Sequence, residues 1–345
     1  MTSTTKRKYW GIISPNMPAA AVAETARQQE SAGLAGTYSC QVYGPPFSAL
    51  AAAATSTSRM SLATGIAIAL TRSPFETAMA AIDLDHLSEG RFILGLGSSV
   101  KSWTGGIFGM PYEKPVAQLR EAIEVIRKVI ALSHTGTLTQ HTGTYYRFDF
   151  SELQPPPPPL RTRVPIWIAA LRGAMTQLGA EIGDGVIGHP MWTIDWLREV
   201  IAKDIKKGLD RSHRQRADIE ITTWLWTTPN TDRRKSIEDA RAVVAFYAGV
   251  AQYEPFFAAH GYAEICKKLQ QGVQQGSYKS VVNLVPDEMA EKFVLAGTPD
   301  EVRRRLEPMW EFLDSVALLP PLYTLSQEEI QSYFHTIGET FYSDL

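Results

Sequence analysis

The stretch that decides the fold is Asp83-Leu-Asp-His-Leu-Ser-Glu-Gly-Arg-Phe-Ile-Leu-Gly-Leu-Gly-Ser-Ser99. Gly90 can end a helix in the left-handed conformation, and the run from Arg91 to Leu96 is typical of a buried strand. Gly95 and Gly97 are expected to leave room beside the backbone for a large planar ligand. The third glycine of a dinucleotide-binding fingerprint is missing. The stretch therefore predicts helix, turn and strand, and it argues against a Rossmann fold.

The same alternation of strand and helix continues on both sides of this stretch. Strands are expected at residues 8–13, 36–40, 61–66, 91–96, 164–169, 185–189, 219–227 and 315–319. Helices are expected at about 19–32, 47–58, 74–87, 115–132, 172–182, 193–207, 299–306 and 326–342. This alternation is typical of a parallel sheet, and eight strand candidates favour a closed barrel over an open sheet. The sequence predicts an α/β fold, a single (β/α)8 TIM barrel over residues 1–345.

Two segments depart from this rhythm and are expected to be insertions, at about 134–163 and 228–297. The first contains a β-hairpin pattern at 135–150 and five consecutive prolines from Pro155 to Pro159. Consecutive prolines can form neither helix nor central strand, so they predict a surface linker. The second is mostly helical from 232 to 275, longer than a usual crossover, and is expected to cover the barrel mouth.

Composition narrows the class of partners. The 345 residues are 44% hydrophobic and carry a formal net charge of -2, so no field attracts nucleic acid or an anionic membrane. The two cysteines are far apart and the seven histidines are scattered, which fits neither a disulfide framework nor a metal site. The N-terminus lacks the apolar core of a signal peptide, and no run of about 18 apolar residues occurs. We expect a cytoplasmic protein that acts on a small molecule, with no nucleic-acid or membrane partner.

Five segments together resemble the luciferase-like oxidoreductases of the bacterial luciferase superfamily, and most of all the branch that depends on the deazaflavin coenzyme F-420. These segments are Thr64-Gly-Ile-Ala-Ile-Ala, Arg72-Ser-Pro, Gly90-Arg-Phe-Ile-Leu-Gly-Leu-Gly, Phe108-Gly-Met-Pro and Ala180-Glu-Ile-Gly-Asp-Gly. The resemblance covers residues 8 to 200 well and the remainder in outline. It implies a barrel enzyme that transfers a hydride between coenzyme F-420 and a small organic substrate, and a homodimer.

Two other functions stay open on the same fold. One is an FMN-dependent monooxygenase that activates dioxygen. The other is a barrel without catalysis that carries a cofactor or ligand. The substrate is not indicated by any motif in the chain.

The candidate cofactor site lies where parallel barrels place their sites, at the carboxyl ends of the strands. The resemblance implies a bulge with a non-prolyl cis peptide at Gly65 and Ile66. Small residues between a strand and a helix also present N–H groups to a phosphate, although Ala169 and Ala170 could simply be core residues. The cofactor-binding candidates are Ser39, Gly65, Ile66, Gly97, Ser98, Ala169, Ala170, Arg172, Gly173 and Gly188. Arg91 is expected to be a structural tie.

Three residues are candidates for catalysis: Cys40, Gln41 and His189. Many members of the resembled family have an acidic residue or a histidine after the second strand, where this chain has Cys40 and Gln41. A buried inert thiol is the alternative for Cys40. His189 ends a strand and could donate a proton near the cofactor. Four tryptophans near mouth loops are candidates for an apolar substrate wall, or for ordinary packing: Trp103, Trp192, Trp224 and Trp226.

Overall fold

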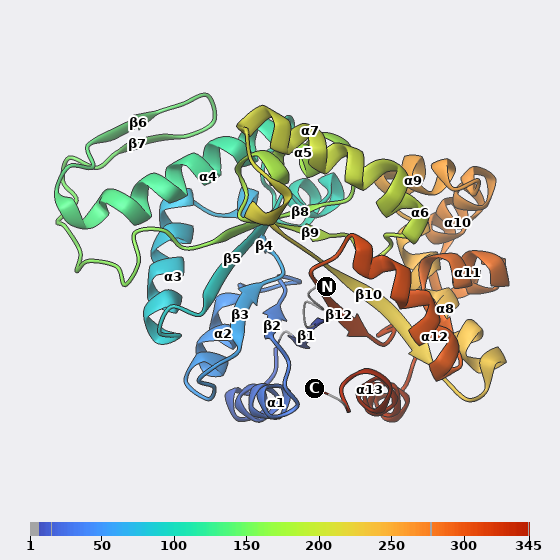
Figure 1. Ribbon diagram of the computed structural model, residues 1–345. Coiled ribbons are helices and arrows are strands. Elements are labelled where there is room, and N and C mark those ends of the chain that lie inside the picture. The colour runs from blue at the N-terminus through green and yellow to red at the C-terminus, as the bar shows by residue number, and fades with distance from the viewer. Residues whose placement is uncertain (1–6, 15, 277, 344) are drawn as a thin grey trace. The chain divides into compact units, whose positions relative to one another are not determined.

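The computed structural model describes residues 7–14, 16–276, 278–343 and 345 (Figure 1). Its contacts divide the chain into two compact units. The first unit contains the residues up to Gly188 together with Glu199–Thr222, and the second contains His189–Arg198 and Thr223–Leu345. The expectation of a single domain stays a prediction.

The first unit is a parallel sheet whose strands alternate with helices along the chain. The strands follow in the order β1 (Lys8–Ile13), β2 (Gly36–Ser39), β3 (Ser61–Thr64), β5 (Phe92–Gly97), β8 (Ile166–Ala170) and β9 (Gly185–Gly188). The short strand β4 (Ala67–Ile68) pairs with β5 beyond the end of β3. The helices are α1 (Ala19–Ser31), α2 (Phe47–Ala54), α3 (Pro74–Leu87), α4 (Pro115–Leu132), α5 (Gly173–Ile182) and α7 (Ala202–Ser212).

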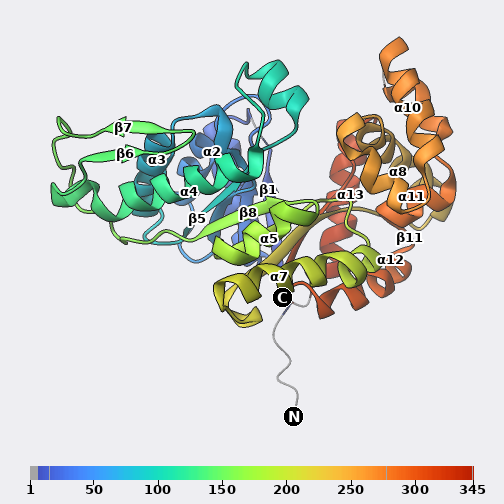
Figure 2. The ribbon, with the colours of Figure 1, turned by 90° about the horizontal axis from the view of Figure 1, so that it is seen from above.

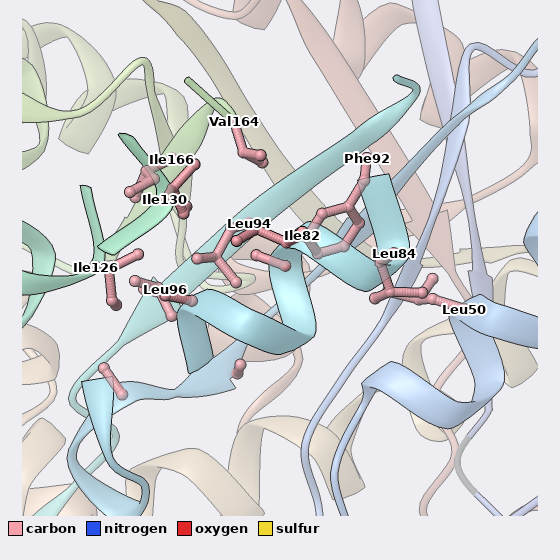
Figure 3. Packing of buried hydrophobic residues seen from close by; sticks show 14 of the residues in the cluster. Leu50, Ile82, Leu84, Phe92, Leu94, Leu96, Ile126, Ile130, Val164 and Ile166 are labelled. Carbon is pink, nitrogen blue, oxygen red and sulfur yellow. The ribbon is translucent and has the colours of Figure 1, made fainter. Parts of the chain in front are cut away.

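Strand β5 is fixed by apolar packing from two helices. Figure 3 shows Leu94 and Leu96 of β5 beside Ile82 of α3 and Ile126 and Ile130 of α4, and all five side chains are buried. The apolar residues of α4 recur every three or four positions, so one stripe of the helix faces the core. The strand that the opening stretch predicts is therefore a rigid element.

The second unit contains β10 (Glu220–Pro229) from Thr223 onward, β11 (Leu295–Gly297) and β12 (Ser315–Leu319), with β10 between the other two. Its helices are α6 (Ile194–Trp196), α8 (Arg233–Ala248), α9 (Glu254–Ala259), α10 (Ala263–Gln275), α11 (Asp287–Phe293), α12 (Pro299–Leu306) and α13 (Gln327–Phe341). The helical character expected for 232–275 is confirmed. The parallel pairing of β11 with the end of β10 was not predicted, because three residues are too short for a periodic signal.

Several expected boundaries move for local reasons. The strand expected at 61–66 stops at Thr64, and the helix expected at 193–207 is divided into α6, a π-helical segment Leu197–Ile201 and α7. Helix α2 ends at Ala54 instead of Ser58. There the Arg91 guanidinium donates hydrogen bonds to the carbonyl oxygens of Ala54, Thr57 and Met60. The prediction that Arg91 is a structural tie is confirmed.

The predicted β-hairpin consists of β6 (Gln140–Thr142) and β7 (Arg147–Asp149), and Figures 1 and 2 both show it beside α4. Its turn is held by Glu121 of α4, which accepts backbone N–H groups from Thr144, Tyr145 and Tyr146 at 2.7–3.1 Å. Burial alone would raise the pKa of Glu121, but these hydrogen bonds and His141 keep it below its usual value. One carboxylate thus anchors the turn of the hairpin to the helix.

We expect Glu121→Gln to lower the free energy of unfolding by about 2 kcal/mol, because charge-assisted hydrogen bonds become neutral ones. Chemical denaturation measures this loss, and hydrogen exchange should show faster exchange at the amides of Thr144, Tyr145 and Tyr146. Glu124→Gln removes the same charge from an exposed position of α4 and is the control. Equal effects of the two variants would contradict the anchoring role.

Candidate functional site

The carboxyl ends of the strands in the first unit bring the predicted cofactor residues to one edge of the sheet. Ser39 ends β2, Gly97 ends β5, Ala170 ends β8 and Gly188 ends β9. Because the strands are parallel, residues paired in register lie at the same height, as Ala170 and Gly188 do. The structure therefore brings these four candidates together.

The bulge that the resemblance implied lies between β3 and β4. The peptide bond between Gly65 and Ile66 is cis. The Gly65 N–H donates to the Ser39 carbonyl oxygen at 2.8 Å, and the Gln41 N–H donates to the Ile66 carbonyl oxygen at 2.9 Å. A Cβ atom on Gly65 would lie 2.6 Å from the Tyr38 ring, so this position requires glycine. The bulge is held at both ends by the segment that follows β2.

Gly95 and Gly97 serve close packing inside the protein. A Cβ on Gly95 would lie 1.8 Å from the Thr64 carbonyl oxygen. A Cβ on Gly97 would lie 2.3 Å from Ile66 Cδ1 and 3.2 Å from Ala169 Cβ. The expectation that the two glycines leave empty space for a planar ligand is therefore wrong, since protein atoms fill that space. Their effect is to let Ile66, Gly97 and Ala169 meet as one continuous surface at the strand ends.

Gln41 holds the bulge through its side chain as well. Its Oε1 atom accepts the Ile68 N–H at 2.9 Å and Arg72 Nη1 at 3.1 Å, and its Nε2 atom donates to Thr71 Oγ1 at 3.3 Å. The amide is buried and does not ionise at neutral pH. These contacts give Gln41 a positioning role and leave it no part as an acid or base.

Arg72 was not among the candidate residues, although the segment Arg72-Ser-Pro was part of the resemblance. Besides its bond to Gln41, its guanidinium lies 5.4 Å from the centre of the Phe47 ring. Burial lowers the pKa of Arg72, which stays charged because the ordinary value is so high. The segment Arg72-Ser-Pro therefore marked Arg72 in the sequence. Its hydrogen bond to Gln41 could not be predicted, because the two residues are 31 positions apart.

Cys40 is a poor nucleophile in this structure. Its side chain is largely buried, and burial raises the pKa of the thiol to about 11. The reactive form of cysteine is the thiolate, which is scarce several pH units below the pKa. The geometry supports the inert thiol over the catalytic one.

The loop after β5 is tightly hydrogen-bonded. Thr104 Oγ1 donates to the Ser98 carbonyl oxygen at 2.8 Å, and the Tyr112 hydroxyl donates to the Ser99 carbonyl oxygen at 2.9 Å. A π-helical segment, Ser102–Ile107, follows, and such segments are frequent at functional sites. Its Trp103 ring stacks with the ring of Tyr43, which is 71% exposed. Ser98 is thus held in place, and the stacked pair of the exposed Tyr43 and the half-buried Trp103 lies on loops that follow β2 and β5.

The expected phosphate-binding turn joins β8 to α5. Arg172 is exposed there, and Gly173 opens the helix with φ +60 and no atom within 4 Å of an added Cβ. The Gly173 N–H already donates to Asp204 Oδ2 at 2.9 Å. Gln177 Nε2 donates to the other carboxylate oxygen, also at 2.9 Å. The turn is open, but its first amide is used by a carboxylate that sequence reasoning missed.

His189 is the first residue of the second unit and lies among aromatic rings. The ring centres of Tyr247 and Tyr253 are 5.0 and 4.9 Å from that of His189. The His189 Nδ1 atom accepts the Met191 N–H at 3.3 Å, which places the proton of the neutral ring on Nε2. Burial lowers the pKa of His189 to about 3. His189 is therefore neutral at pH 7 and can donate a hydrogen bond from Nε2.

No helix in residues 7–14, 16–276, 278–343 and 345 is long and apolar enough to cross a membrane. In the same part of the chain, no three histidine, cysteine, aspartate or glutamate side chains are grouped so that they could hold a metal ion.

Comparison with known proteins identifies relatives over nearly the whole chain. The sequence pattern of the luciferase-like monooxygenase family matches residues 2–313. An uncharacterised protein of Mycobacterium tuberculosis is 31% identical over 323 residues, which are 92% of this chain and 94% of that protein. Another protein of that organism, provisionally named a coenzyme F-420-dependent oxidoreductase, is 30% identical over 321 residues, with coverage of 88% and 90%.

Solved structures confirm the fold. The coenzyme F-420-dependent tetrahydromethanopterin reductase of Methanopyrus kandleri superposes with a TM-score of 0.80 and 22% identity, over 97% of this chain and 98% of that one. The predicted fold class, a (β/α)8 barrel with insertions, is confirmed. The assignment of individual residues to a cofactor stays a prediction.

Proposed function

Because the chain belongs to the luciferase-like monooxygenase family, we propose that it is an oxidoreductase that transfers a hydride between coenzyme F-420 and a small organic substrate. The observation that carries this proposal is the relative with an F-420-dependent name, which is 30% identical over nine-tenths of the chain. The residues at the strand ends fit such a cofactor, because Ile66, Gly97 and Ala169 form a continuous surface of backbone and small side chains.

In this proposal the residues of the chain bind the cofactor and orient it. One face of the ring system packs on Ile66, Gly97 and Ala169. The Gln41 N–H, which donates to the Ile66 carbonyl oxygen, fixes the position of Ile66. The exposed Arg172 before α5 faces the phosphate end of the cofactor. When bound, a deazaflavin supplies hydride chemistry at its C5 atom, so the protein mainly orients and excludes water. A catalytic role of His189 stays a prediction.

A second function, an FMN-dependent monooxygenase, is favoured by the description of the family itself. Titration of the purified protein with coenzyme F-420 and with FMN, followed by absorbance and fluorescence, separates the two. We expect coenzyme F-420 to bind more tightly, and binding of FMN alone would overturn the proposal. Reduction of bound coenzyme F-420 by any substrate excludes a barrel that only carries its cofactor.

We expect Gly97→Ala to weaken the binding of coenzyme F-420 by tenfold or more. The new Cβ displaces the end of the Ile66 side chain, which belongs to the proposed contact surface, and a misplaced contact surface loses affinity. Because only a flexible side-chain end must move, the loss of stability should stay near 1 kcal/mol. The double variant Gly97→Ala/Ile66→Val removes the clashing Cδ1 atom, so it should recover most of the affinity. A single variant that binds as tightly as the wild type would contradict this placement of the ring.

A further inference from the structure

The second unit carries a continuous strip of aromatic rings that the proposed function leaves without a role. Each ring contacts the next, with ring centres 4.7 to 6.0 Å apart. We call this set the aromatic strip, and its members are His189, Trp226, Phe246, Tyr247, Tyr253 and Tyr323. Trp226 is buried, but the other five rings are only half-buried. The strip therefore presents ring surface that a small molecule can contact.

His189, at one end of the strip, is held in a fixed position. Its carbonyl oxygen accepts the Trp192 N–H at 2.9 Å and Thr223 Oγ1 at 3.3 Å. Its Nδ1 atom accepts the Met191 N–H at 3.3 Å, which leaves the proton of the neutral ring on Nε2. The rings of Tyr247 and Tyr253 contact the imidazole, at 5.0 and 4.9 Å between centres. The direction of the Nε2–H group is thus set by the protein before any ligand binds.

The Nε2–H group of His189 is a hydrogen-bond donor without a partner in the part of the chain that the structure describes. It also does not belong to the buried polar atoms that lack a partner there, so it is open to a ligand. A donor among apolar rings forms a stronger hydrogen bond than one in water, and leaving it unmade costs free energy. One neutral donor is therefore combined with a broad aromatic surface.

This combination selects the chemistry of the ligand. Aromatic rings bind flat apolar groups by stacking or by edge-to-face contact. They also attract cations, but the Nε2–H group turns the positive end of its dipole toward the ligand. The strip contains no charged side chain that could pair with an anion, and burial keeps His189 uncharged by lowering its pKa. The matching ligand is neutral and flat, and it carries a hydrogen-bond acceptor.

We propose that the aromatic strip binds a neutral planar compound with a carbonyl oxygen, and that His189 Nε2–H donates a hydrogen bond to this oxygen. Both features determine specificity: the rings select a flat apolar body, and His189 selects the acceptor. That this compound is the substrate of the enzyme rests on the proposed function. Its binding is a property of the second unit alone.

The test uses three small compounds of matched size. Acetophenone has a planar ring and a carbonyl, isopropenylbenzene replaces the carbonyl oxygen by a CH2 group, and cyclohexyl methyl ketone replaces the planar ring. Their dissociation constants are measured with the full chain at pH 7.5 by ligand-observed NMR titration. We expect the wild type to bind acetophenone about fivefold more tightly than isopropenylbenzene, because one neutral hydrogen bond is gained. Acetophenone should also bind at least twofold more tightly than cyclohexyl methyl ketone.

Two variants separate the donor from the rings. His189→Phe keeps a ring in the strip and removes the donor, so acetophenone and isopropenylbenzene should bind within twofold of each other. Tyr253→Leu removes a ring and keeps the donor, so both compounds should bind two- to tenfold more weakly while the ratio between them stays the same. The control Phe334→Leu removes an exposed ring of α13 outside the strip and should change each dissociation constant by less than twofold.

The comparison on the wild type needs no variant, so it decides the matter even where His189→Phe does not fold. A wild type that binds neither aromatic compound, or binds both equally, overturns the proposal, as does a His189→Phe protein that keeps the preference for acetophenone. Titration with coenzyme F-420 is a separate measurement. Failure to bind coenzyme F-420 refutes the proposed function, whereas the preference for acetophenone reports on the aromatic strip alone.

Discussion

Replacing Gly95 with alanine is expected to lower the free energy of unfolding by about 3 kcal/mol or more. The new Cβ would lie 1.8 Å from the carbonyl oxygen of Thr64 and 2.9 Å from Ile187 Cδ1. The first of these atoms belongs to the backbone of β3, so no side-chain rotation relieves the clash. Overpacking of a core costs about 1 to 3 kcal/mol, and more where backbone must move. Separation of β3 from β5 would also break the 2.7 Å hydrogen bond from Thr64 Oγ1 to the Gly95 carbonyl oxygen.

Urea denaturation of wild type and Gly95→Ala, followed by circular dichroism, measures this loss. The control is Gly106→Ala, because an added Cβ at Gly106 meets no atom within 4 Å and the backbone has no positive φ there. Its stability should stay within about 0.5 kcal/mol of the wild type. A Gly95→Ala protein that loses less than about 1 kcal/mol would show that β3 and β5 are not packed as closely as described.

Acid is expected to destabilise the second unit through His189. Its pKa is about 3 in the fold and about 6.5 in an unfolded chain. Between these values the unfolded chain binds a proton that the folded chain does not. Stability from the neutral ring is therefore fully present above about pH 6.5 and is lost as pH falls toward 3, by up to about 1.4 kcal/mol per pH unit. At pH 4.5 the loss from this residue reaches about 2.5 kcal/mol.

Urea denaturation at pH 7.5, 6 and 4.5 tests this expectation when wild type is compared with His189→Asn. The asparagine side chain can still accept the Met191 N–H but cannot take up a proton in this range. We expect the difference in stability between the two proteins to shrink as the pH falls, because only the wild type loses the contribution. Parallel pH profiles for the two proteins would mean that His189 titrates normally.

The regular elements could be predicted from the sequence because they rest on local patterns. Helices α3 and α4 begin and end where Pro74, Leu87, Pro115 and Leu132 indicate, since proline suits the first helical turn and the apolar stripe is continuous. The hairpin β6–β7 was predicted for the same reason, whereas the structural role of Arg91 was expected from the family resemblance. The interruption of the helix expected at 193–207 was not, because a π-helical turn leaves no clear periodic signal.

The candidate site was predictable as a set of strand ends and not as a set of contacts. Any parallel barrel brings Ser39, Gly97 and Ala170 to one edge, so their grouping follows from the fold. The bonds of Gln41 to Arg72 and of Asp204 to Gly173 each join residues 31 positions apart. Such pairs depend on how helices and loops pack, which no local pattern records. For the same reason the sequence could not show that atoms of Thr64 and Ile66 fill the space beside Gly95 and Gly97.

The hydrogen bonds between Glu121 and the turn of the hairpin have a consequence for redesign of the molecule. The carboxylate contacts main-chain N–H groups of the turn, and among the strand side chains it also has His141 of β6 beside it, with Nε2 3.5 Å from Oε1. In the turn, Gly143 is also required, because a Cβ there would lie 2.0 Å from Glu121 Oε1. The exposed positions on either side of His141 and Phe148 can therefore be exchanged, while the turn 143–146 and these two residues are kept. This hairpin is a ready attachment point for a displayed peptide or a label on the first unit.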